Sequence, residues 1–300
     1  MTDGFLNIYK EQGFTSFDVV AKLRGIFGQK KIGHTGTLDP MAEGVLPVAL
    51  GRAAKLTELL IEKDKTYEAV MLLGTVTDTE DVTGKVLRKT SLSDSVTPER
   101  VSETGKTFLG KSLQLPPMYA AIRKDGKHLY EYARAGITVE REKRPIEIYE
   151  LEILDIRLPE VSFRVRCSKG TYIRSLCRDW GEMLGCGGTM KALKRTKVLS
   201  FTAEDAVRLS ELQVMKEEGR IAEAVLPMDV FFPTAPVAKV TEVGEKRLRN
   251  GNPLKKEELL FAGADSPETA AFVKVYEKES LRAFYRYSAE KGVYMPYKML

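Results

Sequence analysis

The segment from Gly33 to Pro40, Gly-His-Thr-Gly-Thr-Leu-Asp-Pro, constrains the fold because it suits neither a helix nor a strand. Its glycines permit positive φ angles, which allow the backbone to approach a ligand closely. Pro40 biases Asp39 toward an extended or turn conformation. Such a loop presents one carboxylate at a fixed angle, although an ordinary Asp-Pro turn capped by its own side chain explains the same residues equally well.

Hydrophobic spacing predicts irregularly interleaved helices and strands around this loop. Apolar residues from Phe17 to Phe27 recur at helical spacing, and Gly28 provides a stop, so we expect a helix over 16–27. Further helices are expected over 53–62, from Thr97 and over 171–184, and strands over 67–76, 146–158, 161–167, 271–276 and 282–287. The acidic stretch 78–84 is interpreted as a solvated hairpin turn, and the basic run 191–197 taken alone as a solvated face.

Several classes of protein are disfavoured by what the sequence lacks. It contains two histidines, His34 and His128, which argues against His-rich metal sites and Ser-His-Asp catalysis. Its three cysteines form no CxxC pair, as expected for reduced thiols in the cytosol. There is no secretory signal, no apolar run of the ~20 residues that span a bilayer, and no Gly-rich nucleotide motif. The net charge of +5 permits a polyanionic partner.

The segment Pro233-Thr234-Ala235-Pro236 marks the expected domain boundary. Beyond it, short strand-like runs alternate with glycine-containing and charged turns. The remaining tail is close to the smallest size that forms its own core, so it suits a small β-rich module.

The loop GHTGTLDPMAEGVLPVALG (33–51) resembles the catalytic loop of the TruB-type tRNA pseudouridine-55 synthases. Other matching segments follow in the order of that family: Lys10 with 13–16, KTYEAVMLLGTVTDTEDVTG (65–84), QLPPMYAAIRKDGKHLYEYARAG (114–136), CSKGTYIRSL (167–176) and ALKRT (192–196). One departure is that Glu11 follows Lys10, where the family usually has proline. Within this family, the chain resembles the bacterial type, whose members act on tRNA as stand-alone enzymes.

The resemblance implies an α+β fold with a mixed, mainly antiparallel central sheet and flanking helices. It implies a catalytic domain over residues 1–235, with an RNA-gripping insertion over 114–145. It also implies a PUA-like RNA-binding domain over 236–300, on the weaker match of residues 249–253.

The resemblance further implies that Asp39 is the catalytic carboxylate, Arg174 its cationic partner, and Tyr67 the residue that stacks on the target uracil. Burial would raise the pKa of Asp39 and an adjacent cation would offset this. Attack at C1′, attack at C6 and a glycal route all remain open. Without the resemblance, Tyr67 would be read as a core aromatic residue and Arg174 as a surface residue of a helix.

For RNA binding, the resemblance implies that the target base is flipped out, at a cost of a few kcal/mol, and His34 fills the space it leaves. The substrate-binding residues expected are Lys10, His34, Tyr172, Leu193, Arg123, Lys124, Lys127, Lys194 and Arg195. The cationic members of the insertion and of 191–197 would contact phosphates.

The predicted activity is isomerisation of uridine 55 in the tRNA T-loop to pseudouridine, without cofactor or metal. The expected partner is tRNA alone, bound by a cytoplasmic monomer with no obligatory protein partner and no membrane association. The alternatives are a guide-RNA-dependent catalytic subunit and a non-catalytic tRNA-binding or folding protein. A hydrolase with one carboxylate nucleophile is a further alternative, but such enzymes usually need a second carboxylate.

Overall fold

The computed structural model describes residues 1–61, 64–263 and 267–300. A nine-stranded mixed sheet of described residues forms its centre. The main strand order is β1 (Gly4–Lys10), β3 (Glu43–Leu50), β12 (Gly188–Val198), β4 (Lys65–Leu73), β11 (Glu160–Cys167), β10 (Arg144–Arg157) and β7 (Gly110–Gln114), with β2 (Ile32–His34) beside β3 and β13 (Phe201–Thr202) beside β12. The β12–β3 pair is parallel and the others are antiparallel, which confirms the predicted fold class.

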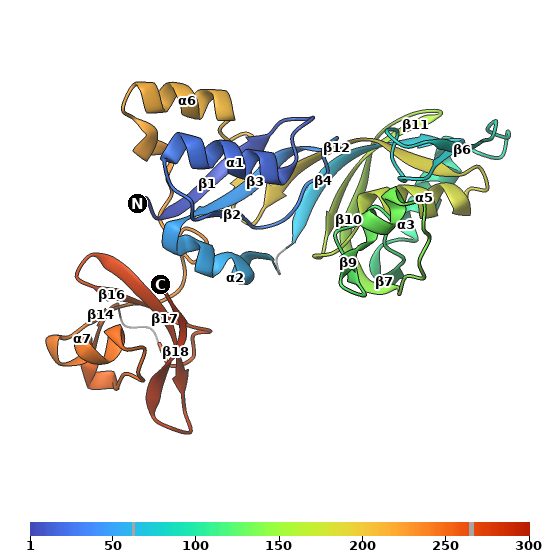
Figure 1. Cartoon of the computed structure of the whole chain (residues 1–300). Helices are drawn as coiled ribbons and strands as arrows, with labels where there is room; N and C mark the ends of the chain where they lie inside the picture. The colour runs from blue at the N-terminus through green and yellow to red at the C-terminus, as the bar shows by residue number, and fades with distance from the viewer. Residues whose placement is uncertain (62–63, 264–266) are drawn as a thin grey trace.

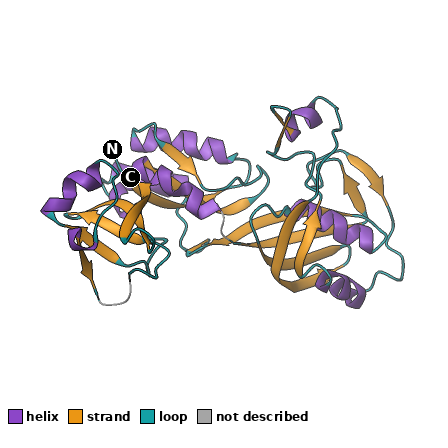
Figure 2. Cartoon of the chain, turned by 90° about the horizontal axis from the view of Figure 1, so that it is seen from below, coloured by secondary structure: helices purple, strands orange, loops and turns teal. Residues whose placement is uncertain are grey.

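Helices pack at the two ends of this sheet (Figure 1). At the β1–β3 end, α1 (Ser16–Phe27) lies beside α6 (Leu209–Glu217) over a core that includes Leu23 and Leu212. At the other end, α3 (Pro98–Lys106) and α5 (Ile173–Met183) pack around Trp180. The view from below shows the two ends as separate lobes joined by a narrower middle (Figure 2).

Helix α1 has the predicted bounds because both of its ends are specified locally. The Thr15 hydroxyl and the Asp18 carboxylate cap its start reciprocally, and Gly28 ends it with a φ of 61° in the left-handed region. The prediction was wrong for the environment of Phe17, which is 64% exposed and lies under the Arg24 guanidinium instead of in the core.

The predicted strand over 67–76 is broken at Gly74. This residue has a φ of 76°, and a Cβ atom there would lie 2.5 Å from the Thr90 carbonyl oxygen. The chain therefore leaves β4 and forms β5 (Thr75–Thr77), which pairs with β6 (Val86–Lys89) outside the main sheet.

The predicted helix over 53–62 is a 3₁₀ turn, η1 (Gly51–Leu56), followed by α2 (Thr57–Ile61). This helix was expected to bury Leu56, Leu59 and Leu60; Leu56 and Leu60 are buried, whereas Leu59 is only half-buried. Position 62 lies outside the described residues.

The basic run 191–197 is not a solvated face, because it belongs to the interior strand β12. Lys191 lies at an irregularity of the strand, between Met190 and Ala192, where it is exposed and pairs with Glu160. Arg195, farther along the same strand, is only 1% exposed.

Between β7 and β10 the chain forms a small hairpin and a helix. The hairpin consists of β8 (Arg123–Lys124) and β9 (Lys127–His128), and α4 (Leu129–Arg134) follows it. This part corresponds to the predicted insertion over 114–145, whose limits stay a prediction.

The tail is β-rich, as predicted, and contains a helix that the sequence did not indicate. Its five-stranded sheet of described residues runs β15 (Leu259–Ala262), β14 (Val237–Val240), β16 (Val273–Glu277), β17 (Ser280–Ser288) and β18 (Val293–Met299), with α7 (Glu242–Arg249) beside it. Short 3₁₀ turns lie at η2 (Ile221–Ala224) and η3 (Lys256–Glu258).

The tail shares a hydrophobic cluster with the main body. Leu281 and Phe284 of β17 belong to the same cluster as Phe5, Val45 and Leu56. Figure 1 shows the tail below the β1–β3 end of the main sheet. None of the helices in the described ranges is both long enough and apolar enough to span a membrane.

Candidate active site

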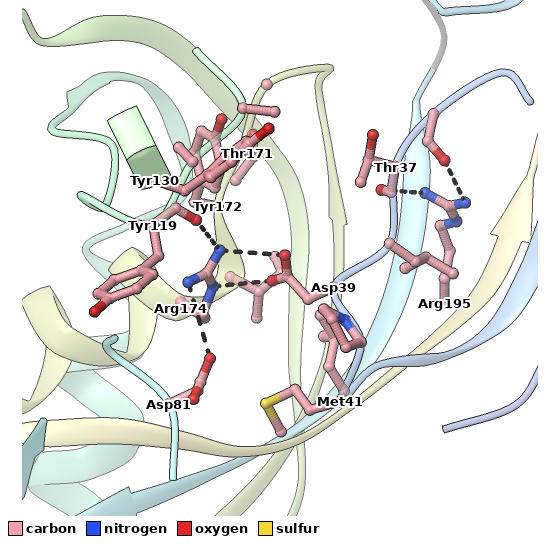
Figure 3. Close-up of a pocket in the computed structure, with 18 of the residues that line it drawn as sticks. Thr37, Asp39, Met41, Asp81, Tyr119, Tyr130, Thr171, Tyr172, Arg174 and Arg195 are labelled. Carbon is pink, nitrogen blue, oxygen red and sulfur yellow. Dashed lines mark hydrogen bonds and ion pairs between the residues drawn. The ribbon is translucent and has the colours of Figure 1, made fainter. Parts of the chain in front are cut away.

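A cleft of about 760 Å³ opens between the two lobes, at the loop that contains Asp39. Its walls come from this loop, from β4 and β12, from the start of α5 and from the insertion. The predicted site residues that line it are Asp39, Tyr67, Tyr172, Arg174, Leu193 and Arg195. Figure 3 shows Tyr119, Tyr130 and Tyr172 on one side of Asp39, and Thr37 and Arg195 on the other.

Asp39 and Arg174 form a two-point ion pair in this cleft, although 135 residues separate them in the chain. Arg174 Nε lies 2.9 Å from Asp39 Oδ2, and Arg174 Nη2 donates to Asp39 Oδ1 at 3.2 Å. The Arg174 side chain is 5% exposed and that of Asp39 is 33% exposed. The planar guanidinium therefore fixes the carboxylate while leaving part of it open to the cleft.

Burial and a nearby acid raise the pKa of Asp39 above its ordinary value. Burial has the largest effect, the Arg174 guanidinium opposes it, Asp81 adds to it and Lys10 opposes it. As expected, burial raises the pKa of Asp39 and a neighbouring cation lowers it, and the effect of burial is the larger of the two. Such a carboxylate is weakly solvated and held in one orientation, as suits a nucleophile or a stabiliser of positive charge.

The remaining donors of Arg174 bind the surrounding chain. Nη1 donates to the Thr79 carbonyl at 3.0 Å and Nη2 to the Tyr119 carbonyl at 2.9 Å, while Nη1 lies 3.8 Å from Asp81 Oδ2. Arg174 thereby connects Asp39 with the 78–84 turn and with the insertion. It is not a surface residue.

The acidic turn 78–84 is not a solvated hairpin, because Glu80 and Asp81 are both buried. Glu80 adopts a φ of 63°, accepts from the Ser175 hydroxyl at 2.6 Å and pairs with Arg178. Asp81 accepts from the Thr83 amide at 3.0 Å. Hydrogen bonds and guanidinium partners compensate for the loss of water, a compensation that the composition of the turn does not reveal.

Tyr67, Tyr172 and Leu193 bring apolar surface to the cleft. Burial raises the pKa of Tyr67, with the Arg195 guanidinium opposing this effect, and burial likewise raises the pKa of Tyr172. Gln114, which sequence reasoning assigned only to the insertion, holds the backbone of Tyr172. Its Nε2 donates to the Tyr172 carbonyl at 3.0 Å, and its Oε1 accepts from the Tyr172 amide at 2.8 Å.

Lys10, which was expected to bind substrate, is fully buried and lies outside the lining of the cleft. Its ammonium donates to the Ala42 carbonyl at 2.6 Å, to the Glu11 carbonyl at 3.1 Å and to the Pro40 carbonyl at 3.4 Å. Burial lowers the pKa of Lys10 to about 8. Lys10 therefore binds the chain on the C-terminal side of Asp39.

Arg195 also fails to extend an exposed phosphate-binding face. Its guanidinium donates to the Val45 carbonyl at 2.7 Å, to the Gly36 carbonyl at 3.2 Å and to the Thr37 carbonyl at 3.4 Å. Lys10 was assigned to substrate binding from the family resemblance and Arg195 from its basic run, whereas the burial of either was not expected because cationic residues are usually solvated. The buried backbone carbonyls that they satisfy are invisible in a sequence.

The other predicted RNA-binding residues lie outside the cleft lining. His34 ends β2, and its Nδ1 accepts from the Gly36 amide at 3.3 Å. Arg123 and Lys127 are exposed on the β8–β9 hairpin, and Lys124 donates to the Glu140 carbonyl at 2.7 Å. Lys194 is half-buried, with its ammonium 6.0 Å from the Tyr9 ring centre. Their predicted contacts with RNA stay predictions.

The described residues contain no group of three or more His, Cys, Asp or Glu residues that could hold a metal ion. Cys167, Cys177 and Cys186 are unpaired and buried, and burial raises the pKa of each thiol. The chemically distinctive groups of the cleft are therefore the carboxylate, the guanidinium and the tyrosines.

Two protein-family models match this chain, and together they cover the residues of the cleft. Residues 24–173 match the TruB family pseudouridylate synthase (N terminal domain), and residues 174–232 match the tRNA pseudouridylate synthase B C-terminal domain. The chain belongs to the TruB family of pseudouridylate synthases. Asp39 lies within the first of these matches, and Arg174 is the first residue of the second.

Curated TruB relatives match this chain over most of its length. The tRNA pseudouridine synthase B of Lachnoclostridium phytofermentans is 46% identical over 308 residues, covering 99% of each chain. That of Lactococcus lactis subsp. cremoris is 36% identical, covering 99% of this chain and 98% of the relative.

Solved structures related to this TruB-family chain include subunits of larger assemblies. A chain of a Cbf5-Nop10-Gar1 complex superimposes with a TM-score of 0.70 at 28% identity, covering 99% of this chain and 82% of that chain. A chain of an H/ACA RNP bound to a substrate RNA containing 2′-deoxyuridine gives a TM-score of 0.70 at 26% identity, covering 99% and 84%. Because 99% of this chain is covered, the likeness extends into the β-rich tail.

Proposed function

We propose that this protein converts uridine 55 in the T-loop of tRNA to pseudouridine and acts as a stand-alone enzyme. The observation that carries the proposal is the Asp39–Arg174 pair in a cleft between two lobes of a TruB-family fold. The names of the relatives that are 36% and 46% identical over nearly the whole chain support tRNA as the substrate.

The proposed reaction is an isomerisation. The bond between N1 of uracil and C1′ of the ribose breaks, the base turns, and C5 bonds to C1′. C5 loses a proton and N1 gains one, so atoms and electrons balance without an oxidant, a reductant or a co-reactant. The chemistry requires a group that attacks or stabilises an electrophilic carbon, together with groups that move a proton.

We assign these roles to residues of the cleft. The Asp39 carboxylate acts on the sugar or on the base, and Arg174 keeps it oriented and favours its charged form. Tyr67 stacks on the flipped uracil, and its hydroxyl is the candidate proton carrier. Tyr172 and Leu193 complete the apolar surround of the base.

RNA binding is assigned to basic groups around the cleft and to the tail. Arg123, Lys124 and Lys127 of the insertion and Lys194 of β12 are proposed to contact phosphates, and His34 to occupy the place of the flipped base. The tail over 236–300 is proposed to act as a PUA-like RNA-binding domain beside a catalytic domain over 1–235. The enzyme is proposed to work as a monomer with no obligatory protein partner.

The test is incubation of purified protein with an unmodified tRNA transcript, followed by nucleoside analysis and mapping of the modified position. We expect pseudouridine at position 55 without any added cofactor. Asp39→Asn preserves the size of the side chain and removes its charge, so we expect it to abolish turnover and retain tRNA affinity. Normal turnover by Asp39→Asn would refute the assigned role, and release of free uracil would indicate a hydrolase.

Guide-dependent action is the second candidate, because the chain superimposes on a chain of an H/ACA RNP. In that case the bare transcript would bind without reacting, and pseudouridine would form only when guide RNA and partner proteins were added. Tight binding with no reaction under either condition would favour the non-catalytic tRNA-binding alternative.

A further inference from the structure

Arg195 occupies an unusual place for a cationic residue, because it lies in the middle of the central sheet. Its backbone pairs with Tyr67 of β4 on one side and, in parallel, with Gly44 of β3 on the other. A β-bulge follows directly, between Arg195 and Lys197. Bulges next to active sites commonly redirect a side chain.

The sequence of β3 accommodates this close backbone approach. Gly44 has a φ of 103°, and a Cβ atom there would collide with the Arg195 carbonyl oxygen. A glycine is therefore required where β3 passes β12. Strand β3 begins only four residues after Asp39, so its approach fixes where the loop that contains Asp39 ends.

All three guanidinium nitrogens of Arg195 donate to backbone carbonyls. The bond to the Thr37 carbonyl is drawn in Figure 3. Gly36 and Thr37 precede Asp39 in the loop, and Val45 lies in the strand that follows it. One rigid planar group therefore binds both ends of the loop. Lys10 binds Pro40 and Ala42 between these ends.

Arg195 also lies next to Tyr67. The two residues are cross-strand partners, both line the cleft, and both are buried. Side chains directly opposite each other on neighbouring strands have their Cβ atoms about 4.5–5.5 Å apart. A displacement of Arg195 would therefore disturb both the loop of Asp39 and the surface on which the base is proposed to stack.

We propose that Arg195 is a positioning residue for Asp39 and Tyr67 and contributes no phosphate contact to tRNA binding. Its guanidinium holds the loop 36–45 in the conformation that keeps Asp39 beside Arg174. This inference rests on the proposed function, since it explains how the same site is kept in order for reaction.

Arg195→Lys tests the inference because it keeps the charge but cannot reach three carbonyls in a fork. With protein in excess over unmodified tRNA, we expect the single-turnover rate constant to fall about 100-fold, the loss typical of a misplaced reacting group. The dissociation constant for tRNA and its dependence on salt should equal those of the wild type.

Two control variants separate this effect from general ones. Leu212→Ala removes a buried side chain of α6, remote from the cleft, and should lower the melting temperature without lowering the rate constant. Arg157→Lys changes an arginine whose side chain is 85% exposed and should match the wild type in both rate and affinity.

Three results would overturn the inference. The first is a rate constant for Arg195→Lys within twofold of the wild type. The second is a loss of affinity with a salt slope that falls by about one, the mark of a lost phosphate contact. The third is an equal loss of rate in Leu212→Ala, which would assign the effect to stability.

If the wild type makes no pseudouridine, the proposed function fails, but the inference about Arg195 can still be tested by hydrogen exchange. We expect Arg195→Lys to speed amide exchange in residues 35–42 at least tenfold while leaving α6 unchanged. Exchange in this loop equal to that of the wild type would overturn the inference whether or not the protein is active.

Discussion

Replacing Arg174 with methionine should shift the pH dependence of the reaction. The guanidinium lies 2.9 and 3.2 Å from the two carboxylate oxygens of Asp39 and is almost fully buried. Two unit charges 4 Å apart interact by about 4 kcal/mol at an effective dielectric constant of 20.

The direction follows from the environment of Asp39. Burial already raises its pKa, and Arg174 opposes that rise, so Arg174→Met should raise the pKa of Asp39 further. If the ionised carboxylate reacts, the rate increases with pH up to this pKa. The deficit of Arg174→Met should therefore be largest and constant below the wild-type pKa, and should shrink about tenfold per pH unit between that pKa and the new one.

The assay is single-turnover conversion of tRNA measured across the whole pH range in which both proteins stay folded. Arg174→Lys is the matched variant, because it retains a positive charge and loses the two-point geometry. We expect its acidic limb to stay near that of the wild type, with a lower plateau. A profile for Arg174→Met that runs parallel to the wild type at every pH would refute the claim that Arg174 favours the ionised form of Asp39.

Three further changes should have measurable effects on stability. The pKa of Lys10 is about 8 in the folded protein and 10.5 ordinarily, so between pH 8 and 10.5 the unfolded chain binds more protons than the folded one. The free energy of unfolding of the wild type, measured by chemical unfolding relative to that of Lys10→Met, should therefore rise across this pH range. A difference between the two proteins that stays constant with pH would contradict this. Gln114→Leu removes both bonds to the Tyr172 backbone and should cost about 1–3 kcal/mol for each buried group left unpaired, whereas an unchanged melting temperature would exclude the bracing role. Gly44→Ala should prevent normal pairing of β3 with β12, and isolation of a stable variant with wild-type activity would disprove the need for glycine beside Arg195.

Features set by neighbouring residues could be predicted from the sequence. The ends of α1 were correct because Thr15 and Gly28 act on their own helix. The strand that begins near Tyr67 was predicted to run too far. The close approach that requires a glycine at position 74 is made by Thr90, which lies too far along the chain to affect the local alternation of apolar residues. Local spacing likewise could not show that Arg24 covers Phe17 at the surface.

The pairing of Asp39 with Arg174 could be expected only from information beyond local sequence patterns. No local pattern brings Arg174 to Asp39, so their pairing was expected only from resemblance to a family, and the geometry agrees with it. The buried charges were missed for the opposite reason. Lys10, Glu80 and Arg195 were expected to be solvated or to face RNA, but all three are buried. Burying a charge is costly unless hydrogen-bond or ionic partners compensate for it, and a sequence does not show those partners.

The hydrophobic cluster that joins the tail to the main body should couple the unfolding of the two parts. Leu281 and Phe284 lie against residues from β1, β3 and η1, and Lys274 donates to Asp229 in the connecting segment at 3.0 Å. A protein shortened to residues 1–235 would present that apolar surface to water, which favours aggregation. Heating the full chain should therefore give one cooperative transition, and any shortened form would need polar substitutions at Phe232 and its neighbours to remain monodisperse.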